Sequence, residues 1–178
     1  MNAVAKQQQL TATAHHEAGH AFADWCYGFK VKSATIVPNV KEATSGCVVS
    51  KIGLRFRSLE CTDPRWAEIG RFHGHLVCLL AGYAAQCHHR PSSVRSYHAL
   101  SDNSQVADLL SRLHAENVVP HVIRYLEATA KNLVKKPRNW FVIECLAAKL
   151  LERRTMTGAE ITEVIFDGFK RYDASLSD

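Results

Sequence analysis

The stretch that decides the fold of this chain is TATAHHEAGHAFADW, residues 11 to 25. Its spacing of alanine, phenylalanine and tryptophan is typical of a helix, which we predict to run from Leu10 to about Tyr27, with Gly28 as its stop. Residues four apart share one face of a helix, so His16 and His20 would present two imidazoles on the same side. The stretch therefore predicts a helix that carries a pair of histidines.

His16, Glu17 and His20 form the pattern HExxH. Two imidazoles one turn apart can bind a single Zn²⁺ ion at about 2.0–2.1 Å. Glu17, beside the first ligand, can take a proton from a water at the metal as general base and return it to the leaving amine as general acid. Gly19 would allow a neighbouring backbone to come close. We predict one zinc ion per chain, with Glu17 as the catalytic residue.

The HExxH pattern supplies two ligands, so a third must come from elsewhere. A metzincin would have Gly at position 23 and His at position 26, whereas this chain has Ala23 and Cys26. A gluzincin would use a glutamate on a following helix, for which Glu60 and Glu68 are the candidates. We expect the other histidines, at positions 73, 75, 88 and 89, to be core or surface residues. The residues alone leave the third ligand open.

The remaining sequence predicts a mainly helical α+β fold. Two β-rich runs, 31–37 and 45–52, predict a small hairpin or sheet near residues 31–52. Helical periodicity begins again near Asp63, Asp102, Pro120, Trp140 and Gly158, and Thr157 with Glu160 forms a capping-box pattern before the last of these helices. We expect a flexible N-terminus over residues 1–9, a loop over 90–101, and one domain over 10–172.

The composition narrows the class of protein. With 47% hydrophobic and 22% charged residues, the 178-residue chain can build a substantial core. Its longest apolar run, residues 76–85, is half of the roughly 20 residues that span a bilayer. Six cysteines without a CxxC pair predict reduced thiols and a cytoplasmic protein. The net charge of +5 comes without a basic stripe, so nucleic-acid binding ranks last.

Several stretches, in the same order along the chain, resemble the zinc-protease domain of the FtsH-type AAA+ proteases. HEAGHA resembles the zinc helix of that family, VKSATIVP followed by Gly46 its strand pair, and LAGYAAQ its Gly-x-x-Ala-Glu helix. SDNSQVADLL resembles the segment with the third ligand, and LAAKLLERRTMTGAEI the C-terminal helices. These stretches occupy residues 16–21, 31–38, 80–86, 101–110 and 146–161, and the resemblance covers about residues 10–166.

The resemblance implies a helical zincin-type protease domain with Asp102 as the third zinc ligand. In the family this aspartate opens a helix and precedes small or apolar residues four, seven and eight positions on. Asp102 has Val106, Leu109 and Leu110 there, whereas the nearby Asp108 does not fit. Gln86 stands where the family usually has Glu, and YHALS at 97–101 replaces the usual lead into the aspartate. The chain has no ATPase module, so the resemblance is to a stand-alone, ATP-independent domain.

The expected activity is that of a zinc metalloendopeptidase acting on unfolded or flexible proteins and peptides, without ATP. We expect Gly46, Cys47, Val48 and Val49 to bind an extended peptide by adding it to a sheet edge. One alternative is a catalytically inactive, zinc-containing binding or adaptor protein. Another is an ImmA-like HExxH regulatory peptidase, which would not explain the LAGYAA and C-terminal matches. FtsH-type domains form rings of six, but a monomer or a dimer is equally compatible with this chain.

Overall fold

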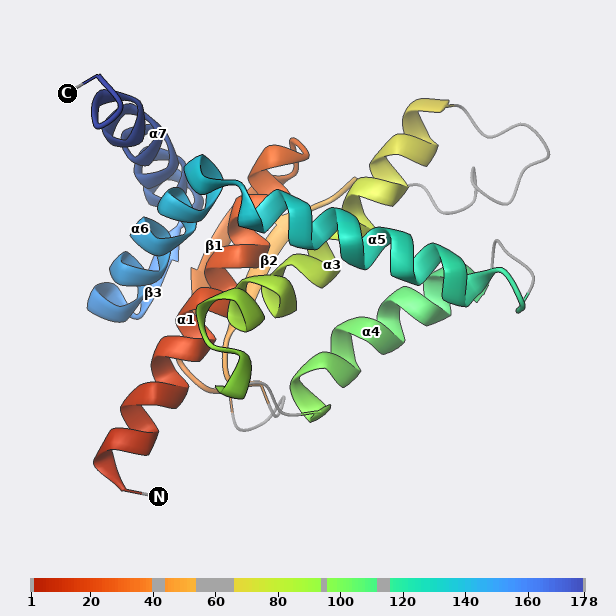
Figure 1. The fold of residues 1–178 in the computed structure, drawn as a ribbon, viewed down its shortest axis with the longest axis horizontal. Coiled ribbons are helices and arrows are strands. Elements are labelled where there is room, and N and C mark those ends of the chain that lie inside the picture. The colour runs from red at the N-terminus through yellow and green to blue at the C-terminus, as the bar shows by residue number, and fades with distance from the viewer. Residues whose placement is uncertain (1, 40–43, 54–65, 94–95, 112–115, 178) are drawn as a thin grey trace.

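The computed structural model describes residues 2–39, 44–53, 66–93, 96–111 and 116–177, and of residues 66–67 and 96–103 it describes only the backbone. Within these ranges the chain is mainly helical with a small antiparallel sheet, as predicted (Figure 1). The helices are α1 (Ala3–Cys26), α3 (Trp66–His89), α4 (Ser96–Ser111), α5 (Val119–Lys135), α6 (Pro137–Arg153) and α7 (Gly158–Ala174), with a short 3-10 turn η1 (Pro91–Ser93). None of the described helices is both long and apolar enough to cross a bilayer.

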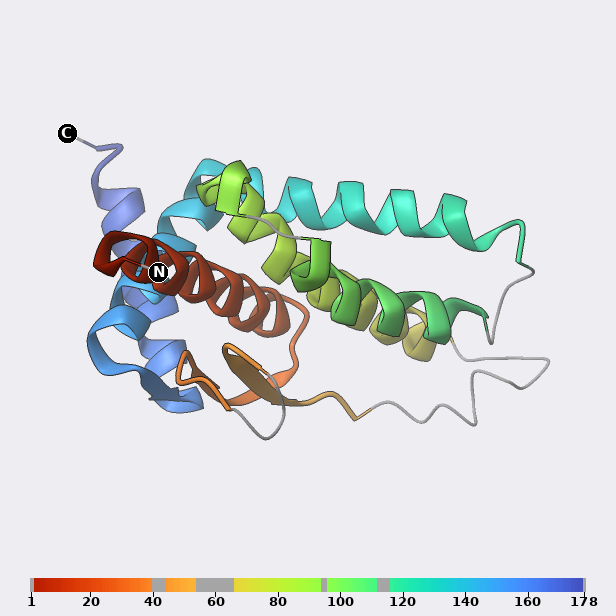
Figure 2. The ribbon, with the colours of Figure 1, turned by 90° about the horizontal axis from the view of Figure 1, so that it is seen from below.

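The sheet has the order β2-β1-β3 and lies along one side of α1, with α5 on the opposite side (Figure 2). Its strands are β1 (Lys30–Thr35), β2 (Cys47–Lys51) and β3 (Thr155–Thr157). The pairing of β1 with β2 confirms the sheet predicted near residues 31–52, and Ala34 faces Val48 in β2 and Met156 in β3. The sequence did not predict β3, because three residues between two helices are too few to show an alternating pattern.

The first helix begins seven residues before the predicted start at Leu10. Asn2 caps it, since its side-chain Oδ1 accepts a hydrogen bond from the backbone N–H of Ala5 at 2.8 Å. The residues that follow include alanine, lysine and glutamine, which are good helix formers even without an apolar stripe. The expected flexible segment 1–9 is therefore helical from Ala3 onward.

Helix α4 also begins earlier than predicted. It starts at Ser96, within the expected loop 90–101, so Asp102 lies inside a helix and does not open one. This corrects the N-terminal position that the resemblance implied for Asp102. The tyrosine, alanine and leucine that precede it are compatible with a helix, and Gly or Pro is absent between Ser96 and Asp102.

Helices α1 and α3 approach each other closely, and the reason is their small residues. A Cβ atom added to Gly19 would lie 2.6 Å from the Cβ of Ala85 and 2.7 Å from the carbonyl oxygen of Ala81. Such distances are too short for any side chain, which confirms the close approach predicted at Gly19. Ala14 and Ala18 of α1 are fully buried in the same core. The tight crossing brings the α3 backbone to the histidines of α1.

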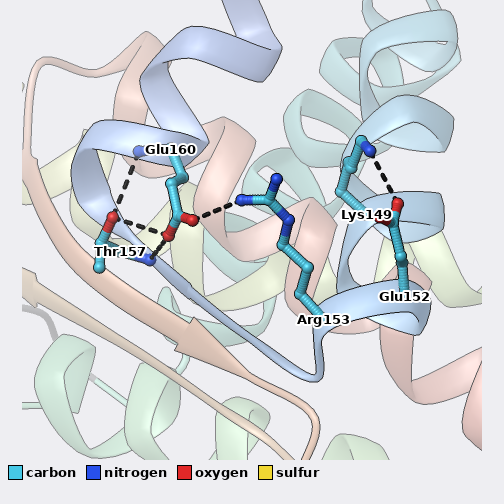
Figure 3. Close-up of polar contacts among 5 residues, drawn as sticks. All are labelled: Lys149, Glu152, Arg153, Thr157 and Glu160. Atoms are coloured by element: carbon cyan, nitrogen blue, oxygen red, sulfur yellow. Dashed lines mark hydrogen bonds and ion pairs between the residues drawn. The ribbon is translucent and has the colours of Figure 1, made fainter.

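The C-terminal unit of α6, β3 and α7 is fastened by polar contacts (Figure 3). The predicted capping box is confirmed, because the backbone N–H of Thr157 donates to Glu160 Oε2 at 2.8 Å while Thr157 Oγ1 accepts from the backbone N–H of Glu160 at 3.4 Å. Arg153 donates to the other carboxylate oxygen of Glu160 at 2.5 Å, and Lys149 pairs with Glu152 at 2.7 Å. These contacts fix the turn from which β3 joins the sheet.

Candidate metal centre

The two histidines of the HExxH pattern point at one another. His16 and His20 are half-buried on α1, and their Nε2 atoms are 3.0 Å apart. Two nitrogens that each lie about 2.0–2.1 Å from one zinc ion would be about as far apart from each other as these two Nε2 atoms are. The helix therefore brings together the two ligands predicted from the sequence.

The hydrogen bonds of the other ring nitrogens determine which tautomer each histidine adopts. His20 Nδ1 lies 2.7 Å from the carbonyl oxygen of Cys78, which can only accept, so this nitrogen donates. His16 Nδ1 lies 3.1 Å from Gln86 Oε1. The amide of Gln86 is oriented by Ser93, because its Nε2 donates to the Ser93 carbonyl at 3.2 Å. His16 Nδ1 therefore donates as well.

With both Nδ1 atoms engaged as donors, the two Nε2 atoms are directed toward the same point. A cation between them could be bound by both nitrogens. Metal-binding histidines commonly donate their second ring N–H to a carbonyl or carboxylate in this way. The pair and its supporting acceptors fit a site for zinc, which favours imidazole nitrogen ligands.

The third ligand is not found among the described side chains. In that part of the chain no group of three His, Cys, Asp or Glu side chains could hold a metal ion. Of the predicted candidates, the side chain of Asp102 and all of Glu60 lie outside the described residues. Glu68 lies in the first turn of α3, and its buried Oε2 has no hydrogen-bond partner. Helix α4 does reach the site region, since Gln105, three residues after Asp102, lines the adjoining pocket.

Glu17 is held against the start of β2. Its side chain is buried, with 5% of its surface exposed, and it lines the same pocket as the histidine pair. A Cβ atom added to Gly46 would lie 2.6 Å from Glu17 Oε1, so only glycine leaves room for the carboxylate there. The structure thus brings the predicted general base beside the predicted peptide-binding strand.

The pocket has a volume of about 470 Å³ and lies between α1, α3 and β2. All four predicted substrate-binding residues line it, namely Gly46, Cys47, Val48 and Val49. In the described part of the chain, β2 pairs only with β1 and forms one edge of the sheet. Val49 on this edge is 45% exposed. The pocket therefore combines a histidine pair, a carboxylate and a strand edge.

Two residues of α3 shape the site, although the sequence did not predict these roles. Gln86, only 2% exposed, orients His16 as described above. A Cβ atom added to Gly82 would lie 2.3 Å from His20 Nε2, so this glycine makes room for the imidazole. Both residues belong to LAGYAAQ, in which Gln86 departs from the family pattern.

His15, next to the first ligand, has a different environment. Its Nδ1 donates to the carbonyl of Thr11 at 2.8 Å, and its ring stacks on His89 with centroids 3.6 Å apart and, at 5.7 Å, on Trp140. Burial is the main cause that lowers the pKa of His15 from 6.5 to about 4. His15 is therefore a neutral packing residue at pH 7, which separates the roles of the two adjacent histidines.

Comparison of the chain with protein-family models and with curated protein sequences gives no match.

Proposed function

We propose that this protein is a zinc metallopeptidase that cleaves unfolded or flexible polypeptides without ATP, as a stand-alone relative of the FtsH-type protease domain. One observation carries the proposal. The Nε2 atoms of His16 and His20 lie 3.0 Å apart, with both Nδ1 atoms engaged, in a pocket that also contains the buried Glu17. The ordered sequence resemblance supports the same reading, and it supplies Asp102 as the third ligand.

In this proposal His16, His20 and Asp102 would hold one zinc ion per chain. Zinc, when bound, supplies a Lewis acid that polarises the scissile carbonyl and makes water a stronger acid. Glu17 takes the proton from the attacking water and gives it to the leaving nitrogen as the C–N bond breaks. Burial of Glu17 against Gly46 keeps the carboxylate in one position for both transfers.

The substrate chain would bind in extended form along β2. The edge of β2 offers backbone hydrogen bonds that do not depend on the substrate side chains, and it lies in the pocket beside the histidine pair. Only an unfolded or flexible segment can add to a sheet edge in this way. This restriction would direct the enzyme to unstructured polypeptides.

The test is cleavage of an unfolded model protein, without ATP, by the zinc-loaded wild type and by Glu17→Gln. We expect both proteins to bind one zinc ion and only the wild type to cleave, with a rate reduction of at least about 100-fold in the variant. Equal cleavage by both would exclude Glu17 as the general base. If both bind zinc and neither cleaves, the peptidase proposal fails in favour of a zinc-containing binding protein.

A further inference from the structure

The pocket continues past the histidine pair to a second group of polar residues. Asp24 lies one turn beyond His20 on α1 and lines the pocket with Ser50 of β2 and His75 of α3. None of the roles assigned to the metal centre uses these three side chains. Asp24 is only 7% exposed. A carboxylate buried to this degree normally has a cationic partner.

The hydrogen-bond partners of Asp24 are neutral. Ser50 Oγ donates to Asp24 Oδ2 at 2.5 Å. The thiol of Cys78 forms a second hydrogen bond to the same carboxylate. Among the described residues that line the pocket there is no lysine and no arginine. Asp24 therefore has no lysine or arginine partner among the described residues that line the pocket.

Ser50 adds a hydrogen-bond acceptor to this end of the pocket. Its Oγ gives its only proton to Asp24, so its remaining capacity is to accept. His75 lines the pocket beside these two residues, with its Nδ1 buried away from solvent. This end of the pocket thus contains a carboxylate and a hydroxyl oxygen, with the imidazole of His75 in its wall. A lysine ammonium has three donors and no acceptor, which complements such a set.

We propose that Asp24, Ser50 and His75 form a specificity subsite for a basic side chain of the substrate, foremost lysine. The proposal rests on the proposed function, because it places a residue of the substrate beside the peptide-binding strand. An anionic side chain would be repelled by Asp24.

The subsite is also consistent with the charge of the whole molecule. A chain of net charge +5 does not attract basic peptides by its overall field. A preference for lysine would therefore have to arise from local contacts in the pocket. Such contacts are short-ranged and depend on one position of the substrate, so the preference should appear at a single peptide position.

The experiment measures peptide binding and not turnover, so that it can fail separately from the proposed function. A fluorescent peptide carries one lysine, moved in turn through its central positions, and is compared with the same peptides carrying norleucine, which keeps the four-carbon stem and lacks the charge. Binding to zinc-loaded Glu17→Gln protein is measured by fluorescence anisotropy. At one position we expect lysine to bind on the order of 30-fold more tightly.

In the Asp24→Asn background this preference should fall to about threefold or less, since the buried charge pair is lost. Asp167→Asn is the matched control, because it removes one carboxylate from the separate groove between α6 and α7 and should leave the preference intact. Circular dichroism checks that each variant is folded. If Asp24→Asn does not fold, peptides with acetyl-lysine in place of lysine provide the second measurement in the parent protein.

Equal affinity for lysine, norleucine and acetyl-lysine peptides at every position would overturn the proposal, and so would the absence of binding. A lysine preference that survives in Asp24→Asn would also overturn it. A preference that disappears with Asp24 supports the subsite even if the protein cleaves nothing, in which case only the proposed peptidase activity fails.

Discussion

The crossing of α1 with α3 and the C-terminal unit of α6, β3 and α7 are built by opposite means. At the crossing, two glycines leave space for neighbouring groups. Gly19 leaves room for the backbone of α3, and Gly82 leaves room for the imidazole of His20. In the C-terminal unit, side chains do the fastening, through the capping box of Thr157 and Glu160 and the ion pair of Arg138 with Asp173 at 2.7 Å. The glycines of the first region lower its helix propensity but allow the close approach. The second region has favourable helix-capping residues and contains none of the proposed zinc ligands.

Substitutions in the two regions should therefore have different effects, on zinc binding in the first region and on stability alone in the second. Changes at the crossing should alter zinc binding with modest effects on the fold. Changes in the C-terminal unit should alter the free energy of unfolding and leave zinc binding intact.

The largest effect is expected from Gly82→Ala. Its Cβ would lie 2.3 Å from His20 Nε2, so the imidazole must move away from His16. We expect zinc affinity to fall by more than about 100-fold, beyond the usual effect of changes around a metal ligand. Competition with a chromogenic chelator measures it.

The matched control for this substitution is Gly70→Ala, on the same helix. A Cβ atom at Gly70 meets nothing within 4 Å. Alanine there should raise the free energy of unfolding by about 0.5–1 kcal/mol and leave zinc affinity unchanged. Equal zinc affinity in both variants would contradict the role assigned to Gly82.

Gln86→Leu should have the next largest effect. It removes the oxygen that accepts the Nδ1 proton of His16, and we expect zinc affinity to fall by about 10- to 100-fold. Gln86→Glu keeps an acceptor at the same place and adds a negative charge, so it should bind zinc at least as tightly as the wild type. Calorimetric titration with zinc compares the three proteins. Similar affinities for Leu and Glu would show that the contact does not position the ligand.

His15 should make stability depend on pH. Its pKa in the folded protein is about 4, against 6.5 without burial, so the unfolded chain binds more protons between these values. The stabilisation is complete above pH 6.5 and is lost as the pH falls toward 4, by about 2 kcal/mol between pH 7 and 5. His15→Phe should remove this share of the pH dependence, as measured by urea unfolding at each pH. An unchanged pH profile would exclude His15 as its source.

The smallest effect is expected from Thr157→Ala in the C-terminal unit. Loss of the capping box should lower the free energy of unfolding by about 1 kcal/mol. Thr129→Ala makes the same chemical change within α5, where the hydroxyl donates to the carbonyl of Tyr125, and should stay within about 0.5 kcal/mol. Thermal unfolding measures both, and zinc affinity should not change. A change in zinc affinity would contradict the expectation that the C-terminal unit affects stability alone.

The parts of the structure that could be predicted are those that depend on local pattern. The pair His16 and His20, the β1–β2 pairing and the capping box follow from residue spacing along one segment. The contact of Gln86 with His16 joins residues 70 positions apart, so no local sequence pattern predicts it. The starts of α1 and α4 were misplaced because polar and mixed segments can be helical without an apolar stripe.

The strand β3 has a consequence for how the protein assembles. The central strand β1 gains its second neighbour only from residues 155–157, far along the chain from β1 and β2. During synthesis, the hairpin of β1 and β2 therefore exists first with an open edge on β1. A chain that stalls or is cut before Thr155 would expose backbone groups there that can pair with other strands. In the finished protein the edge of β1 is covered, and the new edge is the three-residue strand β3, which offers fewer backbone groups for pairing.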